Sequence, residues 1–141
     1  PLLVRLPGRI KPGTVIHQPV SQIDLLPTIL DYVGQRVPEG LHGRSLHPLL
    51  EGAAVAWRDH AFCQRADASR MLRTQRYKYC YGPKTKMVAL YDLQNDPHED
   101  HNLADDPAHA ETVRQLHQRL LDVMRGDGDP LAERWAAAPS P

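Results

Sequence analysis

The first 34 residues constrain the fold more than any other part of the sequence, because they combine an apolar run, two Pro-Gly turns and a helix pattern. Residues 2–6 form an almost continuous apolar run, which favours a strand covered on both faces, as in a parallel α/β sheet. Arg5 in the middle of the run also permits the alternative, an edge strand of a small antiparallel sheet. Because a covered strand needs sheet partners, we expect this sequence to be part of a longer protein.

The helix pattern that follows begins either at Ser21, in capping-box spacing with Asp24, or at Asp24 itself as the N-cap. Pro27 favours Asp24, because it then lies in the first turn, where its missing N–H group is not needed. Gly34 is expected to end the helix. The predicted buried stripe consists of Leu26, Ile29, Leu30 and Val33. We therefore interpret Asp24 as a helix cap rather than a catalytic carboxylate.

The middle of the chain predicts an antiparallel sheet of three or four strands. Four short runs, HAFCQRA, SRMLRT, RYKYCY and MVALYDL, carry β-prone residues at alternate positions. In the third run Tyr77, Tyr79 and Tyr81 share one face of the strand, while Lys78 and Cys80 share the other. The tyrosine face is the one that we expect to pack against the rest of the domain.

A second amphipathic helix is predicted to begin at Asp106 and Pro107, as N-cap and first residue, and to end at Gly126. Its apolar stripe consists of Val113, Leu116, Leu120, Leu121 and Met124. We expect this helix to cover one face of the antiparallel sheet. Residues 127–141 are expected to form a disordered tail, with Trp135 as its anchor.

Charge and composition argue against several classes of function. Lys+Arg and Asp+Glu both total 17, so the formal net charge is zero and no basic excess points to nucleic acid or another polyanion. No apolar run approaches the roughly 20 residues that cross a bilayer, so no membrane span is expected. The two cysteines, Cys63 and Cys80, either pair, if their strands are neighbours, or remain two free thiols.

Residues that carry chemistry are few. Residues 98–101 (HEDH) bring four potential ligands together, but adjacent residues in an extended loop point in different directions, which favours a solvated turn over a metal site. No serine or cysteine lies in a nucleophile-elbow context, and we assign no catalytic and no metal-binding residue. A group of cations in the sheet region suits either anion binding or a solvated sheet face. These cations are Arg65, Arg70, Arg73, Arg76 and Lys78.

Three segments carry motifs in a fixed order. Residues 1–34 resemble the pattern PLIVRWPGxIxPG followed by VSxxDLxPTLLxLAG, and residues 40–50 (GLHGRSLHPLL) contain GxSLxPLL. Residues 71–106 match RTxRYKY followed by LYDLxxDPxExxNLAxD. Together these segments resemble the C-terminal part of a sulfatase, in the alkaline-phosphatase-like superfamily. The resemblance covers most of the chain up to about Arg125.

The resemblance implies an α/β fold of the alkaline-phosphatase type that is only partly present here. Residues 1–52 would be the C-terminal end of the large catalytic domain, including its terminal strand-helix unit. Residues 53–126 would be a small subdomain, an antiparallel sheet of three to four strands packed with a C-terminal helix, and residues 127–141 its tail. The expected partner is the missing N-terminal catalytic region.

By the same resemblance, the whole enzyme hydrolyses sulfate esters or sulfamates of a small molecule or glycan, through a formylglycine nucleophile beside a calcium ion. Formylglycine is made from the Cys or Ser of a C/S-x-P-x-R motif, and neither Cys63 nor Cys80 lies in one. This chain is therefore expected to carry no cofactor and to be inactive alone. The alternatives are part of a phosphodiesterase or phosphonate monoester hydrolase of the same superfamily, or a non-catalytic truncated module.

The resemblance also implies a substrate-facing site, because the C-terminal domain of sulfatases borders the substrate cleft. Its candidates are Gln64, Arg65 and Arg70, around the loop between the first two antiparallel strands. The alternative is that all three residues belong to the solvated surface of the sheet.

Overall fold

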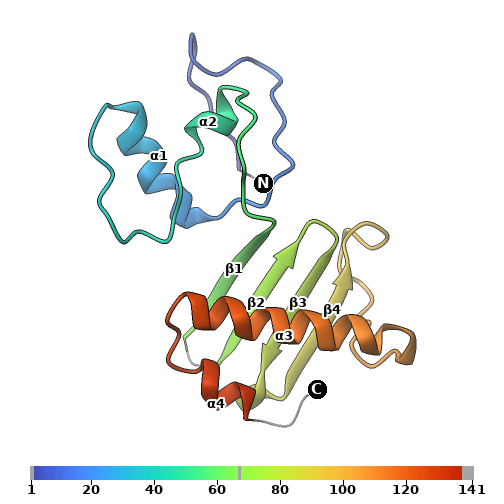
Figure 1. Cartoon of the computed structure of the whole chain (residues 1–141). Helices are drawn as coiled ribbons and strands as arrows, with labels where there is room; N and C mark the ends of the chain where they lie inside the picture. The colour runs from blue at the N-terminus through green and yellow to red at the C-terminus, as the bar shows by residue number, and fades with distance from the viewer. Residues whose placement is uncertain (1, 67, 138–141) are drawn as a thin grey trace. The chain divides into compact units, whose positions relative to one another are not determined.

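The computed structural model describes residues 2–66 and 68–137 (Figure 1). The chain divides into two compact units, which we call the N-terminal unit (Pro1–Arg58) and the C-terminal unit (Asp59–Pro141). Each unit has a hydrophobic core of its own, so each is described by itself. None of the helices in the described part of the chain is long and apolar enough to cross a membrane.

The C-terminal unit is built on a four-stranded antiparallel sheet, which confirms the predicted sheet. Its strands are β1 (His60–Arg65), β2 (Ser69–Thr74), β3 (Tyr77–Gly82) and β4 (Met87–Asp92). Each strand pairs with the next strand in the sequence, so the spatial order is the chain order. Because residues that are directly paired share a face, the register divides the sheet residues into two sets.

One face of this sheet packs against the core of the C-terminal unit. Leu72, Tyr79 and Leu90 lie on this face and are fully buried. The long helix α3 (Ala110–Gly126) covers the face and runs across the strands in Figure 1. Its buried residues include the whole predicted stripe of Val113, Leu116, Leu120, Leu121 and Met124. The predicted packing of sheet and helix is therefore confirmed.

A polar segment after β4 occupies the outer edge of that strand. The Asn102 side chain accepts a hydrogen bond from the Leu90 N–H (2.9 Å) and donates one to the Val88 carbonyl (3.1 Å). The Leu103 N–H donates to the Leu90 carbonyl (2.8 Å). These bonds occupy backbone groups that an edge strand would otherwise leave unpaired.

The end of the C-terminal unit differs from the predicted tail. Residues 132–136 form a short helix, α4 (Ala132–Ala136), and Trp135 is only 2% exposed, with its ring 5.5 Å from that of Tyr81. The helix α3 ends at Gly126, as predicted, and the left-handed glycine is Gly128 (φ +68°), two residues later. Burial of the Trp135 indole ring offsets the conformational entropy that is lost when the residues before it become ordered. The last part of the predicted tail, residues 138–141, lies outside the described residues.

A buried histidine joins α3 to the sheet. His117 is 6% exposed, its Nδ1 lies 3.0 Å from the Tyr79 hydroxyl, and the Tyr81 ring meets its ring edge-on at 4.5 Å. Burial lowers the pKa of His117 below its ordinary value of 6.5. The folded protein therefore favours the neutral imidazole at this position.

This lowered pKa predicts an acid-sensitive C-terminal unit. As the pH falls below about 6.5, the unfolded chain takes up a proton at His117 before the folded chain does, so folding stability decreases. Urea unfolding at pH 7.5 and pH 5 should show this loss, and the slope against pH should be smaller in His117→Gln. An equal slope in the variant would assign the acid sensitivity to other groups.

The N-terminal unit contains two short helices, α1 (Leu25–Tyr32) and α2 (His47–Leu50), and long connecting segments. Its small core consists of Leu46, Leu49 and Leu50, with partly buried apolar side chains around them. Gly34 follows α1 in the left-handed conformation (φ +69°), which confirms the predicted helix end.

Two predictions for the N-terminal unit are wrong in the structure. Residues 2–6 pair with no strand among the described residues, so the expected strand is not formed, since a strand exists only through backbone pairing with a neighbour. The predicted buried stripe of α1 is largely exposed, with Leu26 at 53%, Ile29 at 60% and Val33 at 62%. The helix instead buries Pro27 and Thr28. No described residue covers the apolar face that this pattern predicts.

Candidate functional site

The three residues predicted to face a substrate do not share one surface. Gln64 and Arg70 are direct cross-strand partners, so both belong to the sheet face that carries α3. Arg65 is the next residue along β1 and therefore points to the opposite face. Gln64 and Arg65 are exposed, whereas Arg70 is only 4% exposed. The structure thus separates a pair on one side from a single cation on the other.

The guanidinium of Arg70 is committed to the fold. Its Nε donates to Asp129 Oδ2 (2.5 Å), and another nitrogen donates to the backbone carbonyls of Ala66 and Ser69. Its Cζ lies 5.2 Å from the centre of the Trp135 ring. Burial alone would raise the pKa of Asp129, but hydrogen bonds from Arg70 and from a backbone N–H lower it below its usual value. We therefore assign Arg70 a structural role, in which it packs the segment that contains Asp129 and α4 against the sheet.

The other cations of the sheet region differ in whether they have an acidic partner. Arg76 binds Asp92 (2.8 Å), and this contact is the main reason that the pKa of Asp92 falls to about 2. Lys78 forms an ion pair with Glu99. Of the five cations named above, only Arg65 and Arg73 make no ion pair with a described residue.

The cysteines and the HEDH segment do not form a site. Cys63 and Cys80 are free thiols, and they lie two strands apart, because Met71 is the direct neighbour of both. In residues 98–101, the backbone N–H groups of Asp100 and His101 donate to Asp96 instead of leaving it for an ion. Within residues 2–66 and 68–137, no three His, Cys, Asp or Glu side chains lie close enough to bind one metal.

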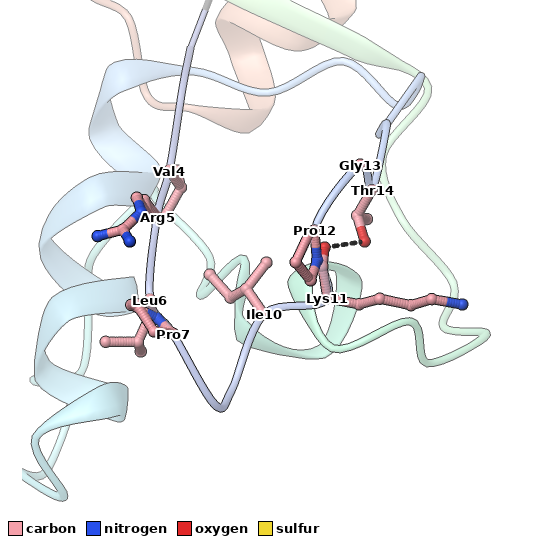
Figure 2. Close-up of a pocket in the computed structure, with 9 residues that line it drawn as sticks. All are labelled: Val4, Arg5, Leu6, Pro7, Ile10, Lys11, Pro12, Gly13 and Thr14. Carbon is pink, nitrogen blue, oxygen red and sulfur yellow. Dashed lines mark hydrogen bonds between the residues drawn. The ribbon is translucent and has the colours of Figure 1, made fainter.

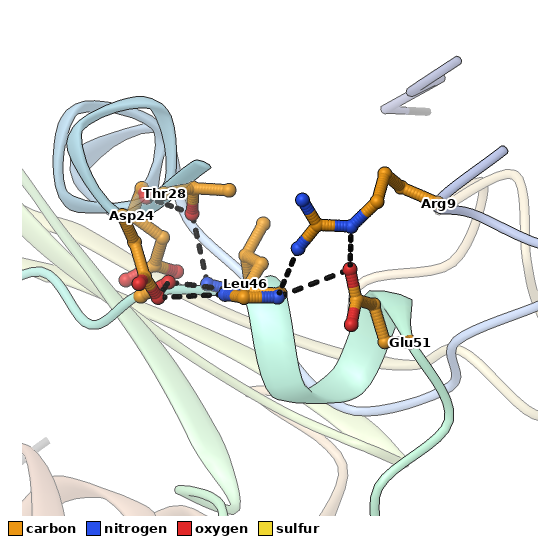
Figure 3. A network of polar contacts seen from close by, with 8 residues as sticks. Arg9, Asp24, Thr28, Leu46 and Glu51 are labelled. Carbon is orange, nitrogen blue, oxygen red and sulfur yellow. Dashed lines mark hydrogen bonds and ion pairs between the residues drawn. The ribbon is translucent and has the colours of Figure 1, made fainter. Parts of the chain in front are cut away.

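Asp24 is the best connected carboxylate of the N-terminal unit (Figure 3). Its side chain is fully buried and accepts hydrogen bonds from the backbone N–H groups of Ser21 (2.8 Å) and Arg44 (2.9 Å). It also forms an ion pair with Arg58. Asp24 is the N-cap residue of α1 by position, as predicted, but its side chain makes no capping bond to that helix. It instead completes the alternative capping box with Ser21, around the 3-10 turn of residues 22–24. Its role is structural, as it joins three segments of the unit.

A second polar group, which includes Arg9 and Glu51 of Figure 3, surrounds His47 at the start of α2. The two ring nitrogens of His47 lie 3.1 Å from carboxylate oxygens of Asp31 and Glu51. Arg9 binds Glu51 (2.9 Å) and lies within 3.3 Å of His47. These contacts hold the segment around Arg9 onto α2, and the side chains are paired with one another rather than directed at an empty site.

The N-terminal segment also folds around a hollow of about 370 Å³ (Figure 2). Its lining includes Arg5, Lys11 and the turn at Pro12 and Gly13. The two cations are exposed and the rest of the lining is mainly apolar or backbone. This hollow has no buried polar side chain to position a ligand, so we assign it no chemistry.

Comparison with known proteins decides the family. The family model described as N-sulphoglucosamine sulphohydrolase, C-terminal, matches residues 1–126. This chain belongs to that family. An ulvan-active sulfatase from Formosa agariphila is 30% identical, over 99% of this chain and 35% of the relative. An N-acetylglucosamine-6-O-sulfatase from Bacteroides thetaiotaomicron is 29% identical, over 92% of this chain and 26% of the relative.

A solved structure extends the likeness to the three-dimensional fold. The phosphonate monoester hydrolase from Silicibacter pomeroyi superposes with a TM-score of 0.75 and 32% identity, over 87% of this chain and 28% of that protein. The α/β fold is therefore of the alkaline-phosphatase type, and the chain corresponds to the C-terminal portion of a sulfatase. It spans about a third or less of the length of these relatives.

Proposed function

We propose that this chain is the C-terminal portion of an enzyme that hydrolyses sulfate esters or sulfamates. The observation that carries the proposal is the match of the sulfatase C-terminal family model to residues 1–126. The ulvan-active and N-acetylglucosamine-6-O-sulfatases among its relatives support a sulfated sugar as the substrate class. In this proposal the present residues complete the core of the enzyme and form part of the cleft wall.

The residues of this chain do not fit the cofactors of a sulfatase. Neither cysteine lies in a C/S-x-P-x-R motif, and the described residues contain no cluster of three metal-binding side chains. We therefore place calcium and formylglycine in the remainder of the longer protein, and no catalytic step is assigned to a residue here. The chain alone is expected to be inactive.

The exposed apolar surface of the N-terminal unit supports a missing neighbour. Ile23, Leu26, Ile29 and Val33 are all more than half exposed, and Leu3 is 92% exposed. Apolar side chains that gather at the surface in large patches normally mark a contact with other protein. We propose that the N-terminal catalytic region of the longer protein covers it.

Gln64 remains our proposed substrate-facing residue. It is exposed at the end of β1, and its amide can donate to or accept from a hydroxyl or sulfate group of a sugar. We leave Arg70 out of this proposal because its buried guanidinium is paired with Asp129, and Arg65 because it lies on the opposite face. The proposed wall of the substrate cleft therefore carries no charge at Gln64.

The longer polypeptide that contains this chain provides the test. We expect it to release sulfate from 4-nitrophenyl sulfate or a sulfated sugar faster than it cleaves a phosphonate monoester, and Cys or Ser→Ala in its C/S-x-P-x-R motif to abolish the reaction. Gln64→Ala should raise KM for a sulfated sugar by up to about tenfold, the effect of one lost hydrogen bond, and leave 4-nitrophenyl sulfate unaffected. Arg134→Ala, an exposed residue of α4, is the control.

A phosphonate monoester hydrolase is the second candidate, because one such enzyme gives the TM-score of 0.75. Faster cleavage of the phosphonate than of the sulfate ester would favour this candidate over the first. No cleavage of either substrate by the intact polypeptide would favour the non-catalytic module.

A further inference from the structure

The sheet of the C-terminal unit has a face that its own helices leave uncovered, and we call it the open face. Both α3 and α4 pack in the core on the opposite side. A row of small and sulfur-containing side chains crosses the open face, one from each strand. In the order β1 to β4 the row is Cys63, which is exposed, Met71 and Cys80, which are half-buried, and Ala89, which is buried.

The charged strand residues that flank this row are all positive. Arg65 lies on one side of the row, and Arg73 and Lys78 lie on the other, where they are direct cross-strand neighbours. No Asp or Glu occurs among the strand residues of this face. Lys78 is paired with Glu99, but Arg65 and Arg73 are exposed and make no ion pair with any residue of the described chain.

The dimensions of the open face suit a helix. Four strands at a spacing of about 4.8 Å make the row about 14 Å long, which equals about nine residues of α-helix. Arg65 and Arg73 each lie two residues from the row along their strands, or about 7 Å, close to the flanks of a helix about 10 Å wide. On the opposite face α3 already runs across the same strands (Figure 1).

We propose that the open face is the docking site of an amphipathic helix whose apolar stripe is bordered on both sides by Asp or Glu. Its carboxylates would pair with Arg65 and Arg73, while the stripe covers the Cys63 row. We assign the helix to the remainder of the longer polypeptide, because the relatives have about two thirds to three quarters of their length outside the matched part. This assignment of the helix rests on the proposed function, whereas the charge and shape of the face do not.

The first test uses this chain and two designed helical peptides with the same leucine stripe, one flanked by Glu and one by Lys. Because Cys63 is exposed in the free chain, its rate of alkylation by iodoacetamide reports cover over the row. We expect the Glu peptide to slow alkylation and the Lys peptide to have no effect. Arg65→Glu combined with Arg73→Glu should weaken binding of the Glu peptide by about tenfold or more.

The matched control is Arg114→Glu with Arg134→Glu, which makes the same change in net charge on α3 and α4. It should bind the Glu peptide as the unchanged chain does. Equal protection by both peptides, or binding that survives the Arg65 and Arg73 reversal, would overturn the proposal. Protection of Cys63 by dimerisation of the chain without peptide would also overturn it, since a second copy would then be the occupant.

The second test places the helix in the intact polypeptide. There Cys63 should resist alkylation, and the Arg65→Glu, Arg73→Glu double variant should make it reactive. A reactive Cys63 in the unchanged intact polypeptide would show that its remainder leaves the face open and would overturn the assignment. This readout is independent of sulfate release, so an inactive polypeptide with a protected Cys63 would contradict only the proposed function.

Discussion

Replacing Gly43 by alanine is expected to unfold the N-terminal unit. A Cβ atom at this position would lie 1.9 Å from the carbonyl oxygen of Ile23 and 2.5 Å from its carbonyl carbon. Both atoms belong to the backbone, so no side-chain rotation relieves the overlap. The next residue, Arg44, donates its N–H to the buried Asp24, and moving the loop away would break that bond. We expect a loss of about 3 kcal/mol or more in unfolding free energy.

The indole N–H of Trp57 reports this change, because it donates to the Pro19 carbonyl (2.9 Å) within the same unit. Its NMR resonance should lose its folded position in Gly43→Ala. Gly40→Ala is the control: a Cβ there meets no atom within 4 Å, and only the left-handed conformation costs about 1 kcal/mol. An unchanged Trp57 resonance in Gly43→Ala would show that the two loops are not in contact.

The second large effect is expected at the Arg70–Asp129 ion pair of the C-terminal unit. Both side chains are less than 5% exposed, so removing either one leaves a buried charge without its partner. Arg70→Met and Asp129→Leu should each lower the free energy of unfolding by about 3–5 kcal/mol. Urea unfolding followed by circular dichroism measures the loss.

The double variant separates the ion pair from general disruption. With both charges replaced by apolar side chains, the desolvation cost disappears, and stability should recover to a value above that of either single variant. Additive losses would mean that the two residues stabilise the unit independently. Arg114→Met, which removes an exposed cation of α3, should change stability by less than about 0.5 kcal/mol.

The sequence predicted the C-terminal unit well because its pattern and its packing agree. Alternation of apolar and polar residues identified all four strands, and the tyrosine face of β3 is the buried one. The stripe of α3 was predicted residue by residue because one sheet face covers it. In both cases the partner surface lies within the same stretch of chain, so local periodicity is a sufficient guide.

The same reasoning failed where the partner is distant or missing. The stripe of α1 has a valid helical period, but periodicity does not tell whether a covering surface is present in the chain. Arg70 is a candidate for substrate contact on sequence grounds, because its carboxylate partner, Asp129, is 59 residues away and has no local signature. Asp24 lies at the predicted helix start, but its partners Arg44 and Arg58 come from later loops and have no local signature. Pairings at such separations are set by tertiary structure alone.

The simple strand order of the C-terminal unit has a consequence for how the protein is made. Every strand pairs with its neighbour in the sequence, through short connections at residues 66–68, 75–76 and 83–86. Such local pairing closes only short loops, so it costs little chain entropy and proceeds fast. We expect the sheet to assemble on the ribosome soon after Asp92 emerges. The helix α3, synthesised later, would then dock onto a template that is already in place.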